Sequence, residues 1–133
     1  MDMKKLEIGI SGQATEKVSP ENTAQKFESG FVNVYGTPAM IALIEKAASE
    51  AVQPYLAENQ TTVGTNLEVK HLAATPLKMK VKASVELIKI MGRRLAFKVV
   101  VEDEREKIGE GIHERFIVNE DKFHQRAQIK GKE

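Results

Sequence analysis

One stretch of the sequence limits the possible folds more than any other: Thr37 to Val52 is the only segment with the pattern of a long helix. Thr37 is a favoured residue type for capping a helix N-terminus, and Pro38 suits the first helical position, where no helical carbonyl needs an N–H. At about 100° per residue, Glu45 lies at the edge of the apolar face, about 40° beyond Ile41. That face is formed by Met40, Ile41, Ile44, Ala47, Ala48, Ala51, Val52 and Tyr55.

From Thr61 onward the apolar pattern changes to a period of two residues, which is typical of half-buried strands. This pattern predicts strands at residues 61–71, 79–87, 95–101 and 108–118, separated by turns rich in Pro, Gly or charge. A weaker pattern at residues 6–18 predicts one or two short strands. In the strand at 61–71, one face is predicted to carry Val63, Thr65, Leu67, Val69 and His71.

One long helix combined with antiparallel strands is an α+β layout. Because the helix is apolar over a broad arc and each strand on one face, the sheet is expected to curl around the helix, which is the hot-dog arrangement. We expect one domain over residues 1–133, with a sheet of about five to six strands and a charged, frayed tail at 120–133. The exposed edges of such a sheet favour a homodimer, which could pair further into a tetramer.

The composition argues against several classes of function. A net charge of +1 gives no electrostatic case for binding nucleic acid or an anionic membrane. The absence of cysteine excludes disulfides and thiolate nucleophiles, and it suits a cytoplasmic protein. The N-terminal residues lack the apolar run of about 7–15 residues that a signal peptide needs. The histidines at 71, 113 and 124 have no metal-ligand spacing, so no metal site is expected.

Three polar residues are candidates for chemistry: Thr37 at the helix start, Glu45 two turns later and His71 at a strand end. Each also has a structural explanation, as a helix cap, a solvated boundary residue and a core histidine bonded to a backbone carbonyl. A catalytic role requires the three to converge, because a hydroxyl needs a base and a carboxylate can orient that base or act directly. The helix N-terminus would add N–H groups suited to an oxyanion. The spacing alone leaves both explanations open.

Two longer strings are more specific, His71-Leu-Ala-Ala-Thr-Pro and Gly111-Ile-His-Glu-Arg. They occur together with Thr37 eight residues before Glu45, with Gly64-Thr65, and with the segments 92–95 and 120–123. From about Val32 to Phe123 the sequence therefore resembles the hot-dog thioesterases of the fluoroacetyl-CoA thioesterase type.

This resemblance implies hydrolysis of acyl-CoA thioesters, with CoA as part of the substrate and no separate cofactor. It implies that Thr37 is the nucleophile or polarises the attacking group, and that His71 is the general base and then acid. Glu45 would be the partner of His71 or the group that activates water. Gly64 matches the glycine whose backbone lies against the thioester. Both a covalent acyl-enzyme and direct attack by water remain open.

The segment before the helix departs from the family pattern. The fluoroacetyl-specific enzyme has a Pro-rich, Phe-bearing lid there, whereas residues 25–34 contain no proline and fewer aromatic residues. Phe31 corresponds to one lid aromatic and Glu28 replaces another, so a general short acyl group is expected. Arg93 and Arg115 are candidates to bind CoA phosphates. The alternatives are an acyl-thioester hydratase or dehydratase of the same fold, and a non-catalytic acyl-CoA-binding protein.

Overall fold

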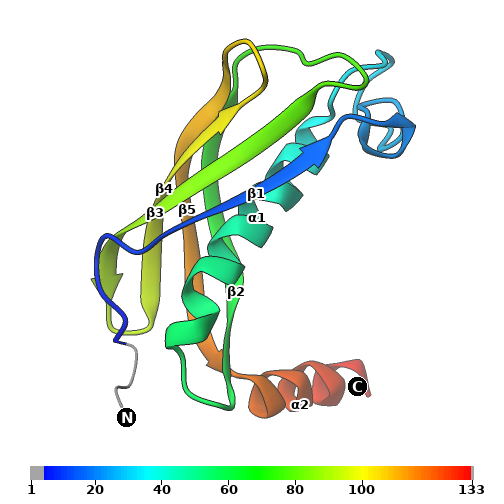
Figure 1. The fold of residues 1–133 in the computed structure, drawn as a ribbon. Coiled ribbons are helices and arrows are strands. Elements are labelled where there is room, and N and C mark those ends of the chain that lie inside the picture. The colour runs from blue at the N-terminus through cyan, green and yellow to red at the C-terminus, as the bar shows by residue number, and fades with distance from the viewer. Residues whose placement is uncertain (1–4, 133) are drawn as a thin grey trace.

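The computed structural model describes residues 5–132, which form one curled antiparallel sheet around a central helix (Figure 1). The strand order is β1-β3-β4-β5-β2. This is the predicted hot-dog arrangement, with five strands. The elements in chain order are β1 (Ser11–Lys17), a 3₁₀ turn (Pro20–Asn22), α1 (Thr37–Val52), a 3₁₀ turn (Gln53–Tyr55), β2 (Gln60–His71), β3 (Lys80–Met91), β4 (Arg94–Glu102), β5 (Lys107–Asn119) and α2 (Glu120–Gly131).

The hydrophobic core lies between α1 and the concave face of the sheet. Met40, Ile44 and Ala48 of α1 are completely buried, as their helical spacing predicted. Leu43, which lies outside the predicted face, is also buried, because β1 crosses α1 on that side. The strands contribute alternate residues to the same core, among them Val81, Ala83, Val85, Leu87, Leu95, Phe97, Val99, Val101 and Ile108.

The start of α1 differs from the prediction by one residue. Gly36 is the N-cap, and the Thr37 side chain makes no capping hydrogen bond. A Cβ on Gly36 would lie 2.9 Å from the backbone N of Ala24 and 3.0 Å from the carbonyl oxygen of Thr23, so only glycine fits under this loop. The hydroxyl of Thr37 is thereby released from capping.

A β-bulge in β2 overturns part of the predicted face pattern. The register with β5 shifts between Gly64 and Asn66, so Thr65 is an extra residue. One extra residue reverses the alternation, because successive side chains point to opposite faces. Thr62 is accordingly buried and Gly64 faces Glu45 of α1, whereas Val63 lies opposite the exposed Phe116. The predicted common face of Val63 and Thr65 with Leu67, Val69 and His71 is therefore wrong.

The two ends of the chain are also organised differently from the prediction. β1 begins only at Ser11, because Ile8 and Gly9 form a turn in which Gly9 has a φ of 102°. The C-terminal residues form α2 rather than a frayed tail: Asn119 caps this helix by accepting a hydrogen bond from the N–H of Lys122. α2 projects away from the sheet, and none of its described residues is buried (Figure 1). Among residues 5–132, no helix has the length and hydropathy needed to cross a bilayer.

Candidate active site

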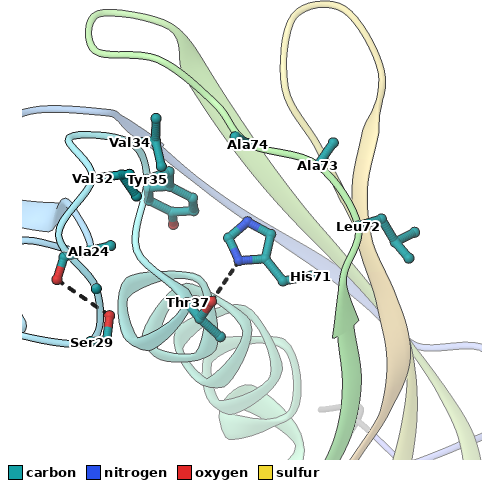
Figure 2. Close-up of a pocket in the computed structure, with 11 residues that line it drawn as sticks. Ala24, Ser29, Val32, Val34, Tyr35, Thr37, His71, Leu72, Ala73 and Ala74 are labelled. Carbon is teal, nitrogen blue, oxygen red and sulfur yellow. Dashed lines mark hydrogen bonds between the residues drawn. The ribbon is translucent and has the colours of Figure 1, made fainter.

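The first turn of α1 and the last residue of β2 meet at a hydroxyl–imidazole pair (Figure 2). Oγ1 of Thr37 lies 2.7 Å from Nδ1 of His71, although the two residues are 34 positions apart in the sequence. The distance is at the short end of the range for a hydrogen bond. The predicted convergence of Thr37 with His71 is thus present within one chain.

The backbone on both sides of this pair is tied together by hydrogen bonds. The N–H of Tyr35 donates to the carbonyl of Thr75 over 2.9 Å, and Val34 forms a β-bridge with Pro76. The Tyr35 ring is buried, and its hydroxyl donates to a carboxylate oxygen of Glu16 over 2.5 Å. Burial and this carboxylate raise the pKa of the Tyr35 hydroxyl, so it stays protonated as a donor. These contacts hold the start of α1 against the segment that follows β2.

The environment of His71 favours the neutral ring. Burial lowers the pKa of His71, and the backbone of Ala73 opposes that effect only in part. Its Nε2 atom is buried and has no hydrogen-bond partner among residues 5–132. A neutral imidazole whose Nδ1 faces a hydroxyl can accept the proton of that hydroxyl.

Next to the pair lies an open pocket of about 360 Å³. Small and aliphatic side chains form most of its wall, and the loop before α1 covers one side (Figure 2). Phe31, the predicted lid aromatic, does not line this pocket and is fully exposed. Val32 and Leu72 at its edge are 58% and 48% exposed, so the mouth is apolar and uncovered in a single chain. The lining residues are Ala24, Ser29, Gly30, Val32, Val34, Tyr35, Thr37, His71, Leu72, Ala73 and Ala74.

Glu45 belongs to a second cluster further along α1. Its Oε2 lies 3.6 Å from Nη1 of Arg115, whose side chain is buried while that of Glu45 is 41% exposed. Arg115 also donates from Nε to Thr62 Oγ1 over 2.8 Å and from Nη2 to the Thr62 carbonyl over 3.0 Å. Gly64 lies against this cluster, because a Cβ there would collide with Oε2 of Glu45. Glu45 is thus an edge residue of α1, partly exposed, whose carboxylate lies against Arg115 and Gly64.

His113 completes this second cluster and was not assigned a role from the sequence. Its Nδ1 lies 2.9 Å from the carbonyl oxygen of Asn66, and its Nε2 lies 3.1 Å from Nη1 of Arg115. The ring is completely buried and stacks on Phe97 at a centroid distance of 6.3 Å. The Gly-Ile-His-Glu-Arg string contained the signal, because residues 113 and 115 of one strand must face the same side.

The two clusters are separate within one chain. Thr37 and Glu45 are about 12 Å apart along the axis of α1 at 1.5 Å per residue. Gly64 and His71 are about 23 Å apart along β2 at roughly 3.3 Å per residue. The structure therefore brings Thr37 to His71, and Glu45 to Gly64 and Arg115, without bringing all three predicted catalytic residues together.

Arg93 belongs to neither cluster. It lies in the turn between β3 and β4 and lines a groove beside α2, together with Phe116, Lys122 and Arg126. No group of His, Asp and Glu side chains in residues 5–132 is arranged to hold a metal ion.

Comparison with solved structures defines the class of protein. A structure of a fluoroacetyl-CoA thioesterase matches with a TM-score of 0.90 and 31% identity, covering 96% of this chain and 98% of that chain. A hypothetical protein of Thermus thermophilus, described as a thioesterase superfamily member, matches with a TM-score of 0.89 and 27% identity, covering 98% of this chain and 96% of that one. The protein is a hot-dog thioesterase, that is, a thioester hydrolase.

The sequence comparison identifies the family. Residues 18–121 match the family described as fluoroacetyl-CoA-specific thioesterase. The fluoroacetyl-CoA thioesterase of Streptantibioticus cattleyicolor is 37% identical over 100 residues, which cover 75% of this chain and 72% of that protein. The chain belongs to the fluoroacetyl-CoA-specific thioesterase family, and the predicted class of reaction, hydrolysis of an acyl-CoA thioester, is confirmed.

Proposed function

We propose that this protein hydrolyses short acyl-CoA thioesters to the free acid and CoA, without a cofactor other than the CoA carried by its substrate. The observation that carries the proposal is the 2.7 Å contact between Thr37 Oγ1 and His71 Nδ1 at the edge of an open pocket. A threonine hydroxyl is a weak nucleophile by itself, and an adjacent neutral imidazole activates it.

The proposed reaction begins when Oγ1 of Thr37 attacks the thioester carbonyl carbon and its proton passes to Nδ1 of His71. The N–H groups of Thr37 and Ala39 lie in the first turn of α1, where no helical carbonyl is available to accept a hydrogen bond from them. They are suited to stabilise the oxyanion, which is worth roughly 2.7–4 kcal/mol per donor in other acyl-transfer enzymes. His71 then protonates the departing CoA sulfur, and a water molecule hydrolyses the acyl-Thr37 ester.

The acyl group that fits this pocket is short. Three of the lining residues, Ala24, Ala73 and Ala74, have the smallest apolar side chain, and none of the lining residues is a free cation or carboxylate. Because Phe31 is fully exposed and does not line the pocket, the chain does not enclose the acyl group as a Phe-bearing lid would. We therefore expect acetyl and propionyl groups to be accepted together with fluoroacetyl.

The proposed active unit is a homodimer joined through β2. β2 is 12 residues long and hydrogen-bonds only to β5 in the described chain, so its other edge is free. A long free edge is a ready template for another strand, and a two-fold axis pairs it with itself in antiparallel fashion. Pairing centred near Leu67 brings the Gly64 end of one strand level with the His71 end of the other.

This arrangement would bring the Thr37–His71 pair of one protomer close to the Glu45 cluster of its partner. Glu45 and Gly64 of one protomer would face Thr37 and His71 of its partner, where the buried Nε2 of His71 lacks an acceptor. A carboxylate at that position would accept a hydrogen bond from the Nε2–H of His71. It would thereby hold the His71 ring in the tautomer whose Nδ1 carries no proton. Glu45 would also be placed to activate the water of the second step. The partner would cover the apolar mouth formed by Val32 and Leu72.

Thiol release tests this proposal. Purified protein is mixed with acetyl-, propionyl-, fluoroacetyl- and longer acyl-CoA, and free CoA is followed with a thiol-reactive dye. We expect turnover that falls with chain length, that is abolished in Thr37→Val, and that is retained in part in Thr37→Ser, which keeps the hydroxyl. Saturable CoA binding without thiol release would instead identify a binding protein, and loss of an enoyl-CoA without thiol release would identify a hydratase.

A further inference from the structure

His113 lies outside the proposed catalytic residues, yet its surroundings determine its protonation state. The guanidinium of Arg115 carries only donors, so Nη1 must donate to Nε2 of His113 across the 3.1 Å contact. Nε2 is then a lone-pair acceptor, and the single ring proton is on Nδ1. That proton is donated to the carbonyl of Asn66, 2.9 Å away. Both nitrogens of a completely buried ring are thus satisfied in one tautomer only.

The bulge in β2 creates this arrangement. Asn66 is the first residue after the register shift and pairs with Glu114. The carbonyl of Asn66 accepts the hydrogen bond from Nδ1 of His113. The ring of Phe97 in β4 stacks on the His113 ring at a centroid distance of 6.3 Å. Thr62 anchors Arg115 on its other side through Nε and Nη2. Held by His113 on one side and Thr62 on the other, Arg115 keeps Nη1 3.6 Å from Oε2 of Glu45.

Burial of the ring, more than any nearby charge, disfavours its protonation. Burial and the Arg115 cation lower the pKa of His113, whereas the Asn66 carbonyl, Glu45 of α1 and Glu114 raise it by a smaller amount. A proton on Nε2 would remove the acceptor for Arg115 and would place two cations 3.1 Å apart. Arg115 could relieve this contact only by moving, and its 3.6 Å contact with Glu45 would be lost.

We propose that His113 is a positioning residue for catalysis: its neutral, Nδ1-protonated ring holds Arg115 so that Arg115 orients the carboxylate of Glu45. This inference rests on the proposed function, in which Glu45 supports His71 and activates water. His113 itself touches no reacting atom. Its role is to keep Glu45 in place, and protonation of His113 would disable the site independently of His71.

Two substitutions separate the two ring nitrogens. The amide oxygen of His113→Gln can reach the position of Nε2 and accept from Arg115. The amide nitrogen of His113→Asn reaches only the position of Nδ1, so it donates to Asn66 and leaves Arg115 without its acceptor. Neither side chain titrates. We expect kcat to fall by about 10- to 100-fold in His113→Asn, the effect of losing one hydrogen bond to a charged group, with KM little changed. His113→Gln should retain most of kcat.

The pH profile supplies a readout that a purely structural role would not change. In the wild type, both His71 and His113 must be neutral, so log kcat/KM should approach a slope of 2 on the acid side. In His113→Gln the slope should fall to about 1, since only His71 still titrates. Equal kcat in His113→Asn and the wild type, or an unchanged acid slope in His113→Gln, would overturn the proposal.

The tautomer can be measured without activity. Ring ¹⁵N chemical shifts of His113, assigned by comparison with His113→Gln, should show a proton on Nδ1 at pH 7. A proton on Nε2 would overturn the inference even in an active enzyme. Absence of thiol release by the wild type would overturn the proposed function instead, and the tautomer would still decide whether His113 holds Arg115 as described.

Discussion

Gly64→Ala should separate activity from stability more clearly than any other single change. The backbone of Gly64 is not in the left-handed region, so alanine fits the local conformation. The added Cβ, however, would collide with Oε2 of Glu45 and lie 3.3 Å from both Nη1 of Arg115 and Cε1 of His113. Arg115 and His113 are buried and held by hydrogen bonds, whereas the Glu45 side chain is 41% exposed. Glu45 will therefore move.

The size of the two effects follows from this difference. Overpacking usually costs about 1–3 kcal/mol, and this cost should be at its lower limit because the displaced group is the end of a flexible side chain. Replacing glycine also removes about 0.4–1 kcal/mol of chain entropy from the unfolded state. The net loss of stability is then about 1 kcal/mol or less, or at most roughly 3–6 °C in Tm for a domain of this size. Loss of a positioned carboxylate costs about 100-fold or more in kcat.

The assay is thiol release from acetyl-CoA with thermal unfolding of the same samples. Gly131→Ala is the matched control, because a Cβ there meets nothing within 4 Å. Gly64→Ala should lose at least about 100-fold in kcat while Tm changes by only a few degrees. Full activity in Gly64→Ala would refute the placement of Glu45 at the active site. A large fall in Tm would refute the claim that Glu45 can move freely.

Three further predictions follow from the buried polar groups and the lid segment. Because burial lowers the pKa values of His71 and His113 in the folded state, the unfolded state binds more protons, so Tm should fall as pH drops below about 6.5. The fall should be shallower in His113→Gln, and an identical pH dependence would contradict this reasoning. Tyr35→Phe removes the hydrogen bond to Glu16 and should destabilise the fold by about 1–2 kcal/mol in denaturant unfolding, whereas unchanged stability would show that this bond does not anchor the segment before α1. Phe31→Ala should leave Tm, kcat and the KM for acyl-CoA nearly unchanged, because the side chain is fully exposed and does not line the pocket; a clear rise in KM would show that Phe31 contacts the substrate.

The parts of the fold that depend on local pattern could be predicted from the sequence. The Thr37-Pro38 signal and the apolar period predicted α1, and the alternation predicted β4 to within one residue at each end. The predicted end of β3 at residue 87 was four residues short, because a register shift between Leu87 and Lys89 interrupts the alternation before Met91. The place of β2 in the sheet could not be predicted, although its place in the sequence was. β2 pairs with β5, some 50 residues later, and the sequence of one strand does not indicate which strand it pairs with. The bulge at Thr65 was missed because its neighbours Gly64 and Asn66 are not apolar and so give no alternation to follow.

The site was predictable only in part for a similar reason. The hydroxyl of Thr37 and the imidazole of His71 were correctly expected to meet. Glu45 was grouped with them by the family resemblance, although eight residues of helix already place it about 12 Å from Thr37 along α1. In the structure Glu45 faces Arg115 instead. Its catalytic role stays a prediction that depends on the dimer. His113 was missed because the Gly-Ile-His-Glu-Arg string was used only for the family resemblance, although alternation along a strand places His113 and Arg115 on the same face.

The central claim, that one active site takes Thr37 and His71 from one protomer and Glu45 from its partner, is tested most directly by a mixed dimer. Thr37→Val and Glu45→Gln chains are co-expressed with two different affinity tags, and the heterodimer is isolated through both tags. Each variant alone should release no thiol from acetyl-CoA. In the heterodimer, one of the two sites combines intact Thr37 and His71 with intact Glu45, so we predict about half of the wild-type rate. A heterodimer as inactive as its parents would show that all three residues act within one chain and would contradict this account.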